Sequence, residues 1–111
     1  MAVVGIAVIP LGTASPSVGE YVRACVDVLK QYPDLIVEPT PMSTVVEGDL
    51  GRILDAVQRM HEVPFTAGAV RVVTHVTIDD RRDRPLTIQS KLNAVRGGAG
   101  AQPSDSGETP L

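Results

Sequence analysis

The N-terminal run of apolar residues places the strongest constraint on what this chain can fold into. Residues 2–9 read Ala-Val-Val-Gly-Ile-Ala-Val-Ile, so they are apolar at both alternating positions. A strand with one face in water would alternate apolar with polar residues, and this run therefore predicts a central strand covered on both faces. Helices of the same chain can cover one face, while the other face can require a partner subunit.

The rest of the chain is expected to supply three more strands and three helices. Two of these helices show apolar stripes at offsets of three and four residues, and both begin at capping residues, Ser17 with Glu20 and Asp49. Prolines at 39 and 41 limit the second strand to a sheet edge. The expected elements are a strand at 2–9 that ends in the turn 10–16, a helix from Ser17 to Pro33, strands at 35–38 and 43–47, a helix from Asp49 to about 68, a strand at 70–79 and a short helix after Thr87.

This order is typical of an α+β protein with a ferredoxin-like fold. The βαββαβ sandwich has a four-stranded antiparallel sheet with two helices on one face, to which a C-terminal helix is added here. We expect the first and third strands to be the central pair and residues 1–96 to form one ligand-binding domain. Residues 97–111 lack the apolar content of a core and are expected to be a disordered C-terminal tail.

Two helices can cover only one face of such a sheet. The other face would present Ala7 and Ile9, or Val8, depending on the register. An apolar sheet face in water drives association, so we expect a homo-oligomer, either a dimer or a dimer of dimers.

Charge and cysteine content argue against several classes of function. The formal net charge is −3, and the arginines of 81–84 alternate with acidic residues at 79, 80 and 83, which does not favour a nucleic-acid partner. Cys25 is the only cysteine, and neither it nor His61 has a second residue at metal-ligand spacing, so no metal site is expected. No signal peptide and no apolar run of membrane-spanning length are recognisable, and a cytoplasmic protein without membrane contact is expected.

Three stretches of the sequence, in the same order and spacing, resemble the family of small thiamine-binding proteins. They are Val-Ile-Pro-Leu-Gly-Thr-Ala-Ser-Pro-Ser-Val at 8–18, Pro-Met-Ser-Thr-Val-Val-Glu-Gly-Asp at 41–49 and Arg-Val-Val-Thr-His-Val-Thr-Ile-Asp-Asp-Arg-Arg-Asp at 71–83. The resemblance implies a ferredoxin-like fold, assembly as a homotetramer, and binding of thiamine or its hydroxymethylpyrimidine moiety without catalysis. Thiamine would be a bound ligand, and no cofactor is implied. Ser43 stands where glycine is common in the family, and its side chain would narrow the pocket.

The candidate ligand-binding residues come from the loop after the first strand and from the third strand. Because these two strands are antiparallel neighbours, that loop would lie near the start of the third strand. One group of hydroxyls is therefore expected, formed by Thr13, Ser15, Ser17, Ser43 and Thr44. Glu47 could accept from the amine of an aminopyrimidine, but it would join this group only across a subunit boundary or through a shifted register. No glycine-rich phosphate loop is present, which favours unphosphorylated thiamine over its diphosphate.

Each candidate also has a purely structural interpretation. Ser17 can cap its helix, Ser15 can serve the turn, and Thr44 can be an ordinary strand threonine. Glu47 can complement the positive end of the second helix. Two other functions stay open. One is an acyl-phosphate hydrolase, against which it counts that no arginine lies in the loop after the first strand and that the only asparagine is Asn93. The other is a sensing or assembly module for another small molecule such as an amino acid.

Overall fold

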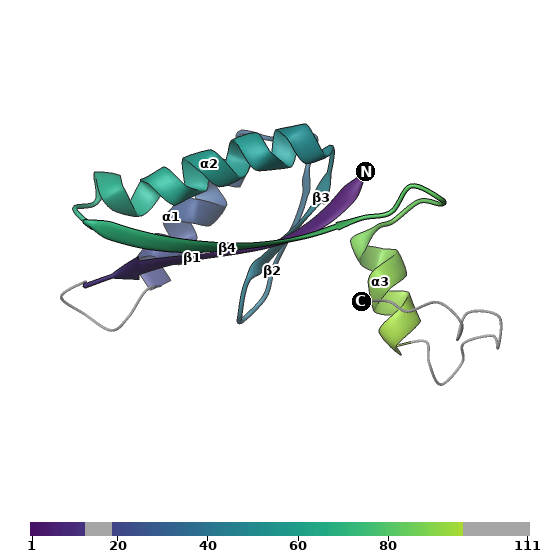
Figure 1. Ribbon diagram of the computed structural model, residues 1–111. Helices are drawn as coiled ribbons and strands as arrows, with labels where there is room; N and C mark the ends of the chain where they lie inside the picture. Colours follow the sequence, from purple (N-terminus) through teal and green to yellow (C-terminus); the bar gives the residue numbers. More distant parts are fainter. Residues whose placement is uncertain (13–18, 97–111) are drawn as a thin grey trace.

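A computed structural model of the chain describes residues 1–12 and 19–96 (Figure 1). The expected order of elements is confirmed. In chain order they are β1 (Ala2–Leu11), α1 (Gly19–Leu29), β2 (Ile36–Pro39), β3 (Thr44–Gly48), α2 (Leu50–Thr66), β4 (Arg71–Asp80) and α3 (Ile88–Arg96). The four strands form one antiparallel sheet in the order β2-β3-β1-β4, so β1 and β3 are the central strands as predicted. This is the α+β ferredoxin-like fold.

The hydrophobic core lies between one face of the sheet and helices α1 and α2. Every second residue of β1 points into it, and Val4 and Ile6 are almost completely buried there against Ile53 and Met60 of α2. Cys25 and Leu29 of α1 complete the packing, which confirms that the apolar stripes of both helices face the sheet. Asp49 caps α2 as predicted, because its carboxylate accepts from the amide of Arg52 at 3.1 Å.

The opposite face of the sheet, which we call the open face, is covered by neither α1 nor α2. The cross-strand pairs place Ala7 and Ile9 on it, while Val8 packs against the core. Ile9 is 39% exposed and Ile36 of β2 is 56% exposed. Helix α3 lies on this side of the sheet at one end (Figure 1). The open face is thus partly apolar, as the N-terminal run predicted.

β1 is longer than expected, and the prediction that Pro10 ends the strand was wrong. The strand continues to Leu11, with Pro10 opposite Val72 of β4. β3 pairs with β1 only as far as Ile6, which faces Thr44, so the second half of β1 has a strand neighbour on one side only. Proline lacks an amide hydrogen and is tolerated where no partner strand needs one. The free edge of β1 that this arrangement leaves becomes part of the site described below.

The charged segment after β4 is paired within itself, as its alternating signs predicted. Arg81 binds Asp83 at 2.5 and 2.9 Å, and Arg82 binds Asp80 at 3.0 Å. The guanidinium of Arg81 lowers the pKa of the Asp83 carboxyl to about 2. No helix within 1–12 and 19–96 is long and apolar enough to cross a membrane.

Candidate functional site

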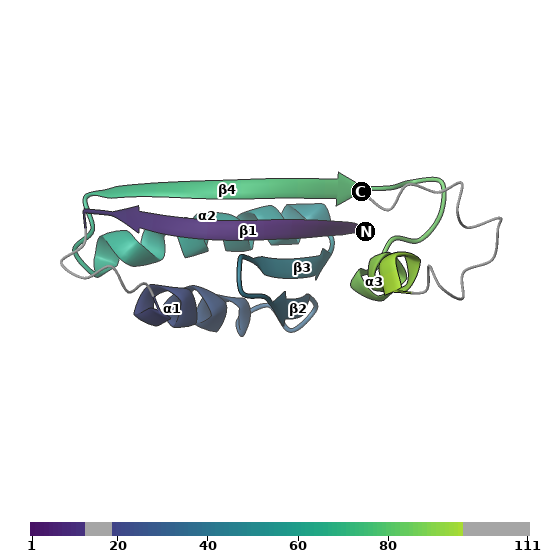
Figure 2. The ribbon, with the colours of Figure 1, turned by 90° about the horizontal axis from the view of Figure 1, so that it is seen from below.

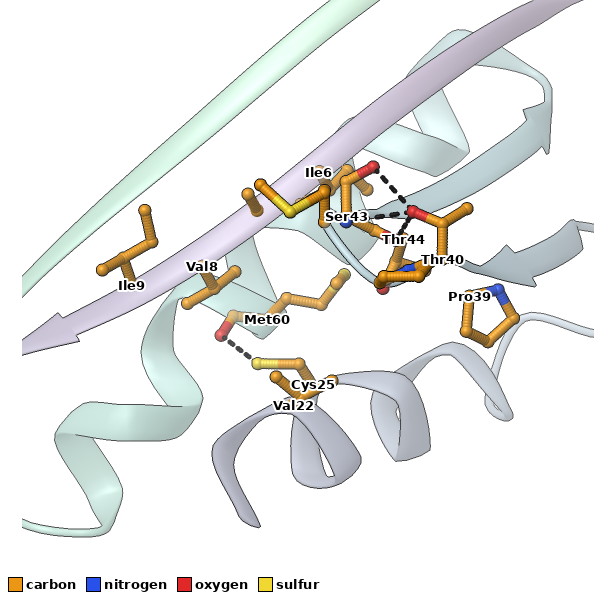
Figure 3. Close-up of a pocket in the computed structure, with 13 residues that line it drawn as sticks. Ile6, Val8, Ile9, Val22, Cys25, Pro39, Thr40, Ser43, Thr44 and Met60 are labelled. Carbon is orange, nitrogen blue, oxygen red and sulfur yellow. Dashed lines mark hydrogen bonds between the residues drawn. The ribbon is translucent and has the colours of Figure 1, made fainter. Parts of the chain in front are cut away.

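The candidate site is a pocket of about 210 Å³ at the N-terminal end of β3 (Figure 3). Because β3 pairs with β1 only up to Ile6, residues 7–9 of β1 form one wall with their unpaired strand edge. Helix α1 and the turn between β2 and β3 form the other walls. The lining residues are Ile6, Ala7, Val8, Ile9, Val22, Cys25, Pro39, Thr40, Pro41, Met42, Ser43, Thr44 and Met60.

The floor of the pocket is apolar, and its one thiol is unreactive at neutral pH. Cys25 of α1 and Met60 of α2 meet there, and the thiol donates to the Met60 carbonyl oxygen at 3.5 Å. Burial raises the pKa of the Cys25 thiol from 9.0 to about 11, so the thiol is protonated at neutral pH. A protonated, buried thiol is a poor nucleophile and a poor metal ligand. The prediction that Cys25 acts as a small buried apolar residue is confirmed.

The rim of the pocket is a tight turn held by one threonine. The Thr40 hydroxyl donates to the Ser43 carbonyl oxygen at 2.7 Å and accepts from the Ser43 amide at 3.1 Å, while the Thr40 amide also donates to that carbonyl at 2.7 Å. Pro39 and Pro41 flank Thr40 and restrict its backbone. Figure 3 shows Thr40 and Ser43 close together, with dashed lines for the hydrogen bonds between them. The rim is therefore organised before any ligand arrives.

Met42 stands at the tip of the same turn and is 87% exposed. It is an apolar side chain at a pocket mouth, on a turn whose backbone is fixed by Thr40. An unbranched thioether adapts its shape to what it contacts. Met42 is thus positioned to cover an occupant of the pocket from the solvent side.

Two of the predicted site residues, Ser43 and Thr44, come together at this pocket. Thr44 is 6% exposed and lies on the helix side of β3, directly opposite Ile6. Adjacent residues of a strand point to opposite faces, but Ser43 lies in the turn before β3, so it can line the same pocket as Thr44. Thr13, Ser15 and Ser17, and with them the capping box, lie outside the described residues.

Glu47, by contrast, does not line this pocket within one chain. It is 6% exposed and lies on the open face, where its Oε1 accepts from the amide of Ile88 at 2.7 Å. Ile88 is the first residue of α3, so the carboxylate occupies the positive end of that helix rather than of α2. Beside it, Lys91 of α3 forms an ion pair with Asp79 of β4. In this chain Glu47 therefore holds α3 against the sheet.

Sequence reasoning missed several parts of the site. Thr40 was not singled out, although its place between two prolines indicates a turn with a restricted backbone, which a hydroxyl can brace. In the sequence, Cys25 and Met60 show only the apolar spacing of core residues. That they contact each other depends on how α1 packs against α2. His61, expected to be a packing residue, lies at the other side of α2, where its Nδ1 is 2.7 Å from the Thr74 hydroxyl.

The described residues that line the pocket offer hydroxyl and backbone groups, and none of them has a charged side chain. A charged ligand buried there would lose its hydration without an ionic partner, which is unfavourable. A flat, neutral heterocycle fits better, because its apolar faces can contact the aliphatic walls while its edge meets the free edge of β1 and the hydroxyls. The geometry alone therefore indicates binding of a small, mostly uncharged ring.

Comparison with known proteins agrees with this fold and adds a family. The profile of the thiamine-binding protein family matches residues 4–96. A UPF0045 protein from Staphylococcus xylosus is 43% identical over 98 residues, which cover 86% of this chain and 92% of the relative. The crystal structure of a hypothetical protein from Methanocaldococcus jannaschii superposes with a TM-score of 0.78 at 41% identity, covering 86% of this chain and 95% of that one.

A second solved structure shows the same fold at lower identity. It is a protein from Thermotoga maritima whose name proposes a role in thiamine biosynthesis or salvage, with a TM-score of 0.70, 24% identity, and coverage of 86% of this chain and 98% of that one. The family profile spans almost all of the residues from β1 to α3. By this match, and by its close relatives, the chain belongs to the thiamine-binding protein family.

Proposed function

We propose that this protein binds thiamine, or its hydroxymethylpyrimidine moiety, in the pocket beside β3, and that it does so without catalysis. The observation that carries the proposal is the strand edge of β1 at residues 7–9, which is left unpaired inside a pocket that also holds hydroxyls. An unpaired strand edge offers alternating amide donors and carbonyl acceptors. An aminopyrimidine offers an alternating pattern of the complementary kind.

The absence of charge among the lining residues indicates which half of thiamine is held. The pyrimidine ring is neutral at pH 7, whereas the thiazolium ring carries a permanent positive charge. Without a carboxylate in the pocket, the thiazolium is better placed outside, near the mouth and the Met42 side chain. A carboxylate that pairs with the thiazolium would have to come from outside the pocket, for example from a second copy of the chain. The same lack of charge disfavours an amino acid, whose ammonium and carboxylate would both need partners.

A binding role is also favoured over a catalytic one by the titratable groups. Of the described residues that line the pocket, only Cys25 has a titratable side chain, and burial raises its pKa to about 11, well above the physiological range. General acid and base catalysis needs groups with pKa values close to the working pH. A pocket of aliphatic walls and hydroxyls can select a ligand but has no group here to transfer a proton.

We propose further that the protein works as a homo-oligomer, a tetramer built as a dimer of dimers, in the cytoplasm. Support for self-association comes from the open face, where Ile9 and Ile36 are 39% and 56% exposed beside half-buried Ala7 and Val45. An exposed apolar sheet face is typical of an interface. Ile36→Asp should lower the mass measured by light scattering. Leu54→Asp, an equal change at a 43% exposed position on α2, should not.

Calorimetry tests the binding proposal directly. Thiamine and hydroxymethylpyrimidine should both bind, while the isolated thiazole alcohol and a panel of amino acids should not. Thr44→Val removes the pocket hydroxyl at constant volume and should weaken binding about tenfold, the value of one hydrogen bond. Thr77→Val makes the same change at an exposed position of β4 and should leave binding unaltered. Tight binding of the thiazole half alone, or an unchanged affinity in Thr44→Val, would contradict the proposed orientation.

A further inference from the structure

Helix α2 contains a proline, Pro64, in its last turn. In an α-helix the amide of each residue donates to the carbonyl four residues earlier, and for position 64 that carbonyl belongs to Met60. Proline has no amide hydrogen, and its ring crowds the same carbonyl, so Pro64 cannot donate to Met60. The hydrogen-bond pattern of α2 therefore leaves this backbone acceptor available to another donor.

The Met60 carbonyl belongs to the floor of the pocket. Met60 is 1% exposed and lines the pocket with Cys25, whose thiol donates to the Met60 carbonyl oxygen at 3.5 Å (Figure 3). A thiol is a weak donor, so it replaces the missing amide only in part. Figure 2 shows that β1 runs past the start of β3 to the end of the sheet at which α2 ends. The carbonyl and the unpaired edge of β1 thus serve the same pocket.

We propose that the Met60 carbonyl oxygen, which Pro64 leaves without an amide donor, accepts a hydrogen bond from the exocyclic amine of the bound pyrimidine, and that the amine displaces the Cys25 thiol. This inference rests on the proposed function and names the group that recognises the amine. An exocyclic amine carries two N–H donors. The edge of β1 can take one of them within its alternating pattern, and the other, once buried, needs a second acceptor.

The selectivity of such a contact follows from the chemistry of a carbonyl group. A carbonyl accepts hydrogen bonds but cannot donate one, so the Met60 oxygen would favour an amine over an oxygen at the same ring position. A pyrimidine without the amine would leave this buried acceptor with only the thiol as its partner. Sites built around a buried hydrogen bond reject analogues that lack the donor, because the protein group is then left poorly paired. Pro64 would act here as a positioning residue, since it acts through the Met60 carbonyl.

The carbonyl can be closed by a substitution that keeps the end of the helix. The amides of Ala67 and Ala69 donate to the Pro64 carbonyl at 3.1 and 2.9 Å, and any residue at this position can accept these bonds. Pro64→Ala supplies the missing amide and should restore the helical bond to Met60. Because Pro64 is almost completely buried, Pro64→Val serves as a second variant that also has an amide but keeps more of the apolar volume. Pro85→Ala, the same change at an exposed position between β4 and α3, is the control.

Calorimetry with hydroxymethylpyrimidine and with its analogue lacking the amine tests the inference. In the unmodified protein and in Pro85→Ala, the amine should raise the affinity about a hundredfold, roughly tenfold for each of its two hydrogen bonds. In Pro64→Ala and Pro64→Val this preference should fall to about tenfold. An unchanged preference in both variants would overturn the inference and leave the binding proposal standing. If the unmodified protein bound no pyrimidine at all, the proposed function would fail and the inference with it.

Infrared spectroscopy tests the state of the carbonyl without any ligand. Cys25 is the only cysteine, so the S–H stretching band reports on this thiol alone, and a hydrogen bond lowers the frequency of that band. In Pro64→Ala the new amide should take over the Met60 carbonyl, and the band should lie at a higher frequency than in Pro85→Ala. Hydroxymethylpyrimidine should shift the band of the unmodified protein in the same direction. A band that neither the substitution nor the ligand moves would overturn the inference.

Discussion

At the scale of single residues, burial determines what the pocket can do chemically. Cys25 is 4% exposed, and desolvation raises its pKa from 9.0 to about 11. Because only the thiolate reacts, the folded protein should contain about a hundredfold less reactive thiol near pH 8 than the unfolded chain. Alkylation by iodoacetamide, followed by mass spectrometry, should therefore be slow in buffer and fast in urea.

The pH dependence of the same reaction gives a sharper form of this prediction. In the folded protein the rate should continue to rise about tenfold per pH unit toward pH 11, whereas in urea it should level off near pH 9. Bound thiamine should slow the folded-state reaction further, since Cys25 lines the pocket. A folded-state rate that levels off near pH 9 would show that the thiol is not desolvated as described.

Thr40 is the residue that we expect to organise the rim. Its hydroxyl bridges the amide and carbonyl of Ser43, and Thr40→Val removes both bonds at constant shape. Because the turn is exposed, global stability should change by less than about 1 kcal/mol. Affinity for thiamine should fall several-fold, since the rim would then have to be ordered on binding. If calorimetry gave the same affinity for Thr40→Val and for the unmodified protein, the order of the rim would not contribute to ligand binding.

At the scale of elements, a buried carboxylate, together with the ion pair between Lys91 and Asp79, fixes the position of α3. Glu47 accepts from the Ile88 amide at 2.7 Å, 41 residues away in sequence, and no residue of α3 itself is buried. Glu47→Ala should leave that amide without an acceptor and free α3 locally. Hydrogen exchange should become about tenfold faster in α3 while β1 and β3 keep their protection. Glu38→Ala, on the same face at the exposed edge strand β2, should leave both unchanged.

The elements also show what sequence reasoning can and cannot reach. The double-sided apolar pattern of residues 2–9, the cap at Asp49 and the prolines around β2 each act locally, so they predicted the strand order correctly. The predicted end of β1 at Pro10 was wrong, because a proline is tolerated where no partner strand needs its amide, and β3, which begins at Thr44, pairs with β1 only as far as Ile6. The pocket was only half found for the same reason. Ser43 and Thr44 were recognised by their hydroxyls, but the unpaired edge of β1 exists only once the pairing is known.

At the scale of the whole molecule, the association that we propose through the open apolar face should make stability depend on protein concentration. If the folded chains associate and the unfolded chains do not, a tenfold rise in protein concentration should stabilise a dimer by about 1.4 kcal/mol. Half of this per chain corresponds to a rise in melting temperature of roughly 3 °C for a domain of this size. Scanning calorimetry over a hundredfold range of concentration measures it. In Ile36→Asp the melting temperature should depend less on concentration than in Leu54→Asp. A melting temperature that is independent of concentration in the unmodified protein would mean that the chain folds and acts alone, and that the open face has no partner of its own kind.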